Sequence, residues 1–198
     1  MTAVLAIAIA IGVAVGFATG GRLARLRGVH IRSTALLLGG AALQVIVLSG
    51  AVQVGSGLTL AAVLISYLAL AVFAVRNLEH AGMGLVLVGV ALNALPIAVD
   101  RGMPVEGHAI VSAGLAKAYE VPLLDFGGKR HLATGSDHLR ALDDRIPDWM
   151  THQVLSVGDL VITVGVGTVV AGLLRPPRRR RGRRRRGRRR RSSGAVAA

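Results

Sequence analysis

The sequence predicts an all-α fold: an integral membrane bundle of five transmembrane helices with a partly helical outer loop and a disordered, arginine-rich tail. Of the 198 residues, 53% are hydrophobic and only 17% are charged, which is less charge than a soluble domain of this length carries. Five apolar stretches are long enough for a helix to cross about 30 Å of hydrocarbon. The basic residues gather in alternate connections between these stretches, as is typical of membrane proteins.

The five predicted spans are continuous apolar stretches rather than alternating ones, which favours helices surrounded by lipid and by one another. They cover residues 2–19, 33–53, 58–75, 82–99 and 154–174, so that residues 1–174 form one five-span domain. The first stretch has no basic segment before it, and basic residues follow it instead. This pattern favours a retained span over a signal peptide.

The distribution of charge predicts how the chain is oriented. The first connection holds Arg22, Arg25, Arg27 and Arg32, and the tail after the last span holds 13 arginines. Residues 54–57 are uncharged, and residues 100–153 carry six basic and eight acidic side chains. Because basic connections stay in the cytoplasm, we expect a multi-pass protein of a bacterial plasma membrane. Its N-terminus and residues 100–153 would lie outside, and its C-terminus in the cytoplasm.

Small residues in two spans predict close helix contacts. The first span has Gly12, Gly16 and Gly20 at intervals of four, and the last has Gly158, Gly165 and Gly172 at intervals of seven. Such stripes let two backbones approach each other in a membrane. The contact is either packing within one subunit or, for the first stripe, homodimerisation.

Polar residues inside the spans need partners or a purpose. Asn93, Asp100 and Asp159 lie at compatible depths near the outer ends of the fourth and fifth spans. Two interpretations remain open: a hydrogen-bond network that fixes helix packing, or the floor of a polar pocket open to the exterior.

Residues 100–153 are too many for a simple connector. Pro104 favours the start of a helix that reaches about residue 119, and Ser136 favours a second helix through Leu142. Trp149 lies where an interfacial anchor belongs. The histidines and carboxylates of this loop match no metal-binding spacing, so we expect them to be solvated, with no metal and no cofactor.

Several short motifs resemble a family of small bacterial multi-pass membrane proteins of unknown function. They are Asn93, Gly102-Met103-Pro104-Val105, Lys129 with His131, Asp144-Arg145-Ile146-Pro147 and Ser156-Val157-Gly158-Asp159. The resemblance covers most of the body and excludes the arginine tail. It implies the same fold and an outer location of these motifs. The candidate ligand-binding residues are Asn93, Asp100, Met103, Pro104, Lys129, His131, Asp144, Ser156 and Asp159.

Two of these motifs also show a weaker likeness to the lipoprotein signal peptidases, which carry two aspartates at the membrane interface. Asp144-Arg145 is similar to their Asp-Arg pair, and Asp159 is placed like the aspartate that enters their last helix. Ser156 stands where their motif has asparagine. The likeness implies an aspartyl hydrolase in which Asp144 and Asp159 share a proton and activate water.

The tail, residues 175–198, cannot fold alone because its like charges repel one another. Its arginines would contact anionic lipid headgroups at about 1 kcal/mol each. The residues assigned to this contact are Arg178, Arg179, Arg180, Arg181, Arg183, Arg184, Arg185 and Arg186. A functionless low-complexity expansion is the alternative, and the lack of interleaved aromatic residues argues against specific nucleic-acid binding.

The sequence therefore favours a non-enzymatic scaffold or accessory protein that binds a ligand, a lipid or a protein partner at its outer face. Its expected partners are the bilayer, anionic headgroups and either a second copy or another membrane protein. An aspartyl hydrolase using Asp144 and Asp159 and a small transporter are the alternatives.

Overall fold

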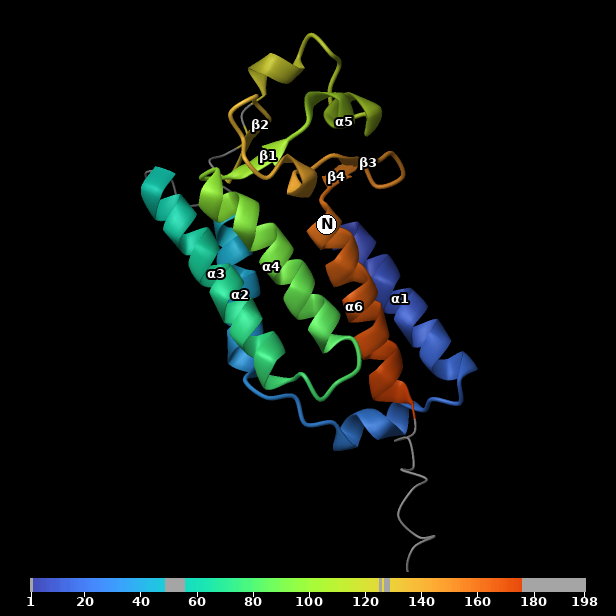
Figure 1. Cartoon of the computed structure of the whole chain (residues 1–198). Coiled ribbons are helices and arrows are strands. Elements are labelled where there is room, and N and C mark those ends of the chain that lie inside the picture. The colour runs from blue at the N-terminus through green and yellow to red at the C-terminus, as the bar shows by residue number, and fades with distance from the viewer. Residues whose placement is uncertain (1, 49–55, 125, 127–128, 176–198) are drawn as a thin grey trace, which may run out of the picture.

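The computed structural model describes residues 2–48, 56–124, 126 and 129–175. Within them, long helices form at all five predicted positions (Figure 1). They are α1 (Thr2–Ala18), α2 (Thr34–Leu48), α3 (Ser56–Arg76), α4 (Met83–Val99) and α6 (Val157–Leu174). The predicted end of the second stretch at residue 53 and the arginine tail from residue 176 lie outside the described residues.

The five helices lie side by side in the order α1, α6, α4, α3, α2, so that α6 packs between α1 and α4 (Figure 1). Residues 100–155, which we name the cap, cover one end of the bundle, and α1 begins at that end. We name the opposite end the basal end. It carries a 3₁₀ helix, η1 (Leu23–Gly28), and the turn between α3 and α4.

The cap is mixed rather than helical, which corrects the all-α expectation. It contains the strands β1 (Met103–Val105), β2 (Arg130–Leu132), β3 (Ile146–Asp148) and β4 (Gln153–Leu155). Its helical pieces are α5 (Gly107–Ser112), η2 (Val121–Leu123) and η3 (Arg140–Leu142). β1 pairs in parallel with β2, with Pro104 opposite His131, and β3 pairs antiparallel with β4.

The predicted cap helices are largely wrong for two physical reasons. Residues 103–105 are buried and take part in strand pairing, so the first helix begins only at Gly107 and ends near Gly114, whose φ is +71°. Ser136 shares a hydrogen bond with Thr134 instead of capping a helix, and only the 3₁₀ turn η3 follows it. The last predicted span also starts late, because residues 154 and 155 belong to β4.

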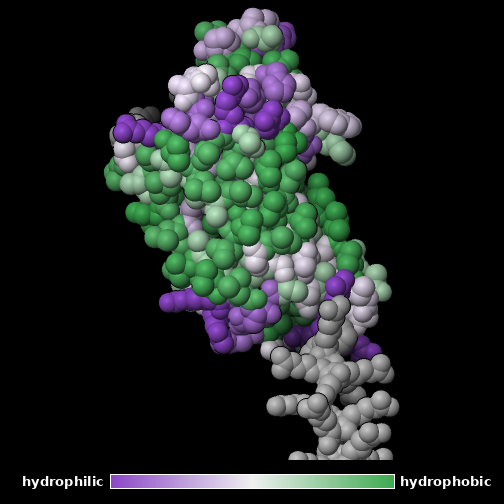
Figure 2. Space-filling view, in the orientation of Figure 1, coloured by the Kyte–Doolittle hydropathy of each residue, from purple (hydrophilic) through white to green (hydrophobic). Residues whose placement is uncertain are grey.

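The sides of the bundle expose an apolar belt. Large apolar side chains point outward from all five long helices, among them Ile11, Leu38, Ile65, Val88 and Val164. Figure 2 shows hydrophobic residues filling the middle of the molecule, with hydrophilic residues at the cap and the basal end. Among the described residues, two helices, at 57–76 and 157–174, are long and apolar enough to cross a membrane, and the described parts of α1, α2 and α4 are shorter apolar helices.

Glycines bring α6 close to both of its neighbours. A Cβ on Gly12 would lie 2.5 Å from the carbonyl oxygen of Gly167, and one on Gly16 would lie 2.6 Å from Leu174 Cδ1. On the other side, a Cβ on Gly89 would lie 2.7 Å from the Gly158 carbonyl oxygen. Gly12 and Gly16 of the first stripe and Gly158 and Gly165 of the second therefore pack within the chain, whereas a Cβ on Gly20 would meet nothing within 4 Å. The face of α1 that carries Gly12 and Gly16 is occupied by α6.

Asn77 holds the basal connections together. Its side chain is completely buried, accepts a hydrogen bond from Arg32 N at 2.8 Å, and donates to Arg32 O and Phe73 O. Arg25 Nη1 donates to the carbonyl oxygens of Leu174 and Gly20, at 3.0 and 3.2 Å. These carbonyls lie at or just after the C-terminal ends of α6 and α1, where backbone acceptors lack helical partners.

The contact at Gly158 provides a stability test. A Cβ there would collide with Asn93 Oδ1 and approach Gly89 O to 2.9 Å. We expect Gly158→Ala to lower the free energy of unfolding by about 1–3 kcal/mol, since overpacking forces backbone shifts. Gly84→Ala is the control, because a Cβ added at this position of α4 would meet nothing within 4 Å. Thermal unfolding of purified protein would contradict this packing if both variants melted like the parent.

Candidate functional site

Asn93, Ser156 and Asp159 form a buried hydrogen-bonded cluster between α4 and the start of α6, which we name the polar node. Asn93 Nδ2 donates to Asp159 Oδ1 at 2.7 Å, and Ser156 Oγ donates to Asn93 Oδ1, also at 2.7 Å. All three residues are at most 5% exposed. The node contains Asn93 and Asp159 of the expected network, and Ser156 joins them. Asp100, expected in the same network, pairs with His138 instead.

The local sequence explains how the node forms. Ser156 is the N-cap of α6, and its Oγ accepts from Asp159 N at 2.9 Å. Asp159 Oδ2 accepts in return from Ser156 N at 3.3 Å. This reciprocal capping box satisfies two backbone donors that a helix start leaves unpaired, and a carboxylate there is also favoured by the helix dipole. Asp159 therefore lies in the first turn of α6, nearer its start than the sequence predicted.

Three more charged side chains lie around Asp159 and the rest of the node, where the cap meets the bundle. Arg130 forms an ion pair with Asp144, with 2.7 Å between Nη2 and Oδ2, and the Asp144 side chain is only 2% exposed. Asp144 also interacts electrostatically with Asp159 and Lys129. Lys129 Nζ lies 5.9 Å from the ring centre of Tyr67 on α3. Two acids and two bases thus balance one another in a largely buried region.

Strand pairing places Asp144 at this position. Its backbone N–H donates to Pro104 O at 2.9 Å, and its carbonyl accepts from Glu106 N at 3.0 Å. β1 is therefore flanked by β2 on one side and by the Asp144 backbone on the other. Arg130 belongs to β2, so its ion pair with Asp144 joins the two segments that flank the buried strand β1.

Burial changes the pKa values of two charged side chains beside the polar node, Asp144 and Lys129. Burial raises the pKa of Asp144 to about 6, and the charge of Asp159 adds to the rise, while Arg130 and Lys129 oppose it. Burial also lowers the pKa of Lys129, and the neighbouring Arg130 lowers it further. A carboxyl group with a pKa near 6 can exchange protons at physiological pH.

The other predicted site residues serve the architecture of the cap. Asp100 Oδ1 accepts from His138 N at 3.0 Å and lies 2.9 Å from His138 Nδ1. Burial disfavours ionisation of Asp100, but these hydrogen bonds outweigh it and lower its pKa. His131 Nε2 lies 3.1 Å from Asp137 Oδ1. Met103 and Pro104 are buried in β1.

The expectation that the cap carboxylates are solvated is wrong for several of them. Asp143 and Asp144 are at most 1% exposed, and the side chain of Asp137 is 8% exposed. Neither carboxylate oxygen of Asp143 has a hydrogen-bond partner within the described residues. Burial and the nearby Asp137 and Glu106 raise its pKa. Asp144 is held against Val105 and Pro104, which lie about 40 residues earlier, so the local sequence carried no signal of its burial.

Sequence reasoning also missed Arg130 and Gln153, which line a cavity of about 320 Å³ inside the cap. Most of its lining is apolar, including Val105, Ile110 and Leu115. Arg130 Nε and Gln153 Oε1 are buried and have no hydrogen-bond partner within the described residues.

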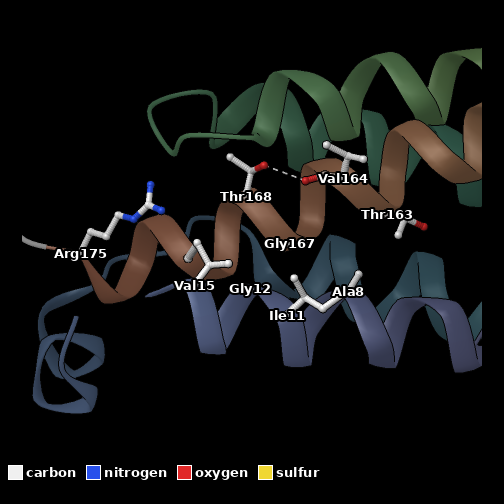
Figure 3. Close-up of a pocket in the computed structure, with 10 residues that line it drawn as sticks. Ala8, Ile11, Gly12, Val15, Thr163, Val164, Gly167, Thr168 and Arg175 are labelled. Atoms are coloured by element: carbon white, nitrogen blue, oxygen red, sulfur yellow. Dashed lines mark hydrogen bonds between the residues drawn. The ribbon is translucent and has the colours of Figure 1, made fainter. Parts of the chain in front are cut away.

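A second cavity, of about 340 Å³, is an apolar groove on the flank of the bundle between α1 and α6 (Figure 3). Its two threonines do not offer their hydroxyl protons to a ligand. Thr163 Oγ1 donates to Asp159 O at 2.7 Å, and Thr168 Oγ1 donates to Val164 O at 2.8 Å. The groove therefore presents chiefly hydrocarbon surface.

Asp144 predicts a pH dependence of stability. Its pKa is about 6 in the folded protein against an ordinary 3.8, so the folded chain binds more protons between these values. The contribution of Asp144 to the free energy of unfolding is therefore fully present below pH 4 and is lost as the pH rises through 6. The loss is on the order of 3 kcal/mol, at about 1.4 kcal/mol per pKa unit. We expect Asp144→Asn to reduce the loss of thermal stability between pH 5 and pH 7.

Asp148→Asn is the matched control for this experiment. Hydrogen bonds from Thr151 lower the pKa of Asp148, so its titration lies below the tested range. The variant removes the same charge from the cap. Equal pH slopes for the parent, Asp144→Asn and Asp148→Asn would show that Asp144 is not the titrating group.

Comparison with known proteins agrees with the expected family relationship. Residues 28–171, which include α2 to α5, the cap and all but the last three residues of α6, match the family of unknown function DUF5317. No curated protein and no solved structure gave a significant match to the chain. Because the family match covers most of the chain, this protein belongs to the DUF5317 family.

Proposed function

We propose that this protein is a five-span membrane protein without enzymatic activity, whose cap binds a small amphipathic ligand on the outer side. The apolar belt supports the membrane location, because a soluble monomer rarely exposes so large a contiguous apolar surface. The same five helices bury their remaining faces against one another and so form one bundle.

The lengths of the helices are compatible with this topology. Seventeen residues in α1 and in α4 extend about 26 Å at 1.5 Å per residue. This is a few ångströms short of an average hydrocarbon core, and local thinning of the bilayer accommodates such a mismatch at modest cost. α3 and α6 have 21 and 18 residues.

Charge supports the orientation with the cap outside. The basal end carries Arg22, Arg25, Arg27, Arg32 and Arg76, while residues 100–153 have two more acidic than basic side chains. Basic segments are retained in the cytoplasm. Both the basal connections and the arginine tail then lie on the cytoplasmic side.

The cap cavity is the observation that carries the ligand-binding proposal. Small-molecule sites are mostly apolar with a few placed polar groups, and this cavity combines an apolar lining with the unpaired Arg130 Nε and Gln153 Oε1. A hydroxyl or a protonated carboxyl group would accept from the first and donate to the second once the two side chains turn toward the cavity. The fitting ligand class is therefore a short apolar molecule that ends in such a group.

The polar node gives less support to aspartyl hydrolysis. Both carboxylate oxygens of Asp159 already accept hydrogen bonds, from Asn93 and from the Ser156 backbone. Asp144 is paired with Arg130. A pair of catalytic aspartates needs oxygens free to hold a shared proton and a water molecule, and this arrangement uses them to hold α4, α6 and the cap together.

The helices likewise give less support to a small transporter. Transport sites are commonly built where membrane helices are broken near the middle of the bilayer. Here α1, α3 and α6 are continuous, and the proline of α4, Pro96, lies in its last turn.

Single cysteines test the topology, since the natural chain contains none. They would replace Ser33, Ser56, Ser136 and Ser192 one at a time. A membrane-impermeant maleimide added to intact cells should label positions 56 and 136, and should reach 33 and 192 only after permeabilisation. Labelling of 33 and 192 in intact cells would invert the protein and place the cap in the cytoplasm.

Hexanoic acid and hexan-1-ol are suitable probes of the cap cavity. We expect saturation-transfer NMR on protein in nanodiscs to detect saturable binding, and Gln153→Leu to weaken it about tenfold by removing one buried acceptor. Gln44→Leu is the matched control, because it removes another buried amide with an unpaired atom, far from this cavity on α2. Equal binding by both variants and the parent would contradict the proposed site.

A further inference from the structure

The basal end contains a cavity of about 1210 Å³ that is separate from the cap. It lies between η1, the turn joining α3 to α4, and the last turns of α6. Its charged and titratable lining residues are Arg25, His30, Glu79, His80 and Arg175. Glu79 is directed to Arg32, with 3.7 Å between Oε1 and Nε, so the lining is cationic on balance.

Hydrogen bonds position the two lining arginines. Arg25 uses Nη1 to reach the carbonyl oxygens of Leu174 and Gly20, and Arg175 uses Nε to donate to Thr19 Oγ1 at 2.8 Å. Within the described residues, the remaining guanidinium N–H groups of both side chains have no hydrogen-bond partner. Guanidinium groups with free donors are the side chains that most often bind a phosphate, because their N–H groups are charged and lie in one plane.

The rest of the lining is apolar and leads toward the belt. Val169, Gly172 and Leu173 contribute one wall from α6. The same helix carries Val164, an exposed residue of the apolar belt, further along. The cavity thus has a cationic floor at the edge of an apolar surface. A soluble phosphate would use only the floor, whereas a phospholipid would use both the floor and the wall.

The cavity is unsuited to the arginine tail. The tail begins directly after α6 and carries twelve arginines between residues 178 and 191. Its positive charges would be repelled by Arg25 and Arg175. An anion fits instead, and the proposed topology places this end at the headgroups of the cytoplasmic leaflet, where anionic lipids are abundant.

We propose that the basal cavity binds the headgroup of an anionic phospholipid, with its phosphate between Arg25 and Arg175 and its acyl chains along α6. This is a discrete site with one lipid. It is distinct from the diffuse attraction that the arginine tail exerts on any anionic surface.

Native mass spectrometry of the full chain in an uncharged detergent tests the proposal, with phosphatidylglycerol and phosphatidylcholine as probes. We expect one phosphatidylglycerol to be retained in a saturable complex and phosphatidylcholine to be lost. Arg25→Gln should weaken retention at least about tenfold, the usual cost of a hydrogen bond to a charged group. Arg27→Gln, which removes the same charge from an exposed residue of η1, should retain the lipid.

A second pair of variants covers the case in which Arg25→Gln disturbs the helix ends. Arg175→Gln removes a lining residue, and Arg22→Gln removes an exposed arginine of the same end that does not line the cavity. We expect lipid loss for the first and not for the second. The discrete site would be overturned if the two variants of each pair lost phosphatidylglycerol equally. It would also be overturned if the parent protein retained phosphatidylglycerol and phosphatidylcholine equally. Full displacement by millimolar inorganic phosphate would overturn the lipid assignment in favour of a free anion.

Discussion

The hydrogen bonds among Asn93, Ser156 and Asp159 are the constraint on which the rest of the structure depends. They join α4 to α6 at a point where Gly158 leaves no room for a side chain between the two helices. They also determine where α6 begins, because the same Ser156 and Asp159 form its capping box. β4 ends at Leu155, immediately before this start. The position of the cap on the bundle therefore follows from a contact within the bundle.

α6 connects the polar node to the rest of the molecule. Its glycines admit α4 on one side and α1 on the other, so a single helix holds the bundle between two close contacts. Its beginning lies next to the strand that supplies Gln153 to the cap cavity, and its last turns form a wall of the basal cavity. The two proposed sites are chemically different, and each is built on an element that α6 holds in place.

The sequence predicted the bundle well because each long helix has a continuous apolar pattern that does not depend on distant partners. It also placed Asn93 and Asp159 at matching depths, and the structure joins them by a hydrogen bond. The cap was harder to predict, since its strands have only three residues each and β1 and β2 pair across about 25 residues of intervening chain. The burial of Asp143 and Asp144 and the role of Arg130 depend on these non-local pairings.

A double-mutant cycle on Asn93 and Asp159 tests the central claim most directly. The free energies of unfolding of Asn93→Ala, Asp159→Ala and the double variant would be compared with that of the parent in one detergent. Contacting residues in a hydrogen-bond network show interaction energies of about 0.5–3 kcal/mol, whereas independent sites add within a few tenths. The buried, charge-assisted hydrogen bond between the two side chains should give a coupling of about 1 kcal/mol or more. Strict additivity of the two substitutions would contradict the polar node as the interaction that organises this fold.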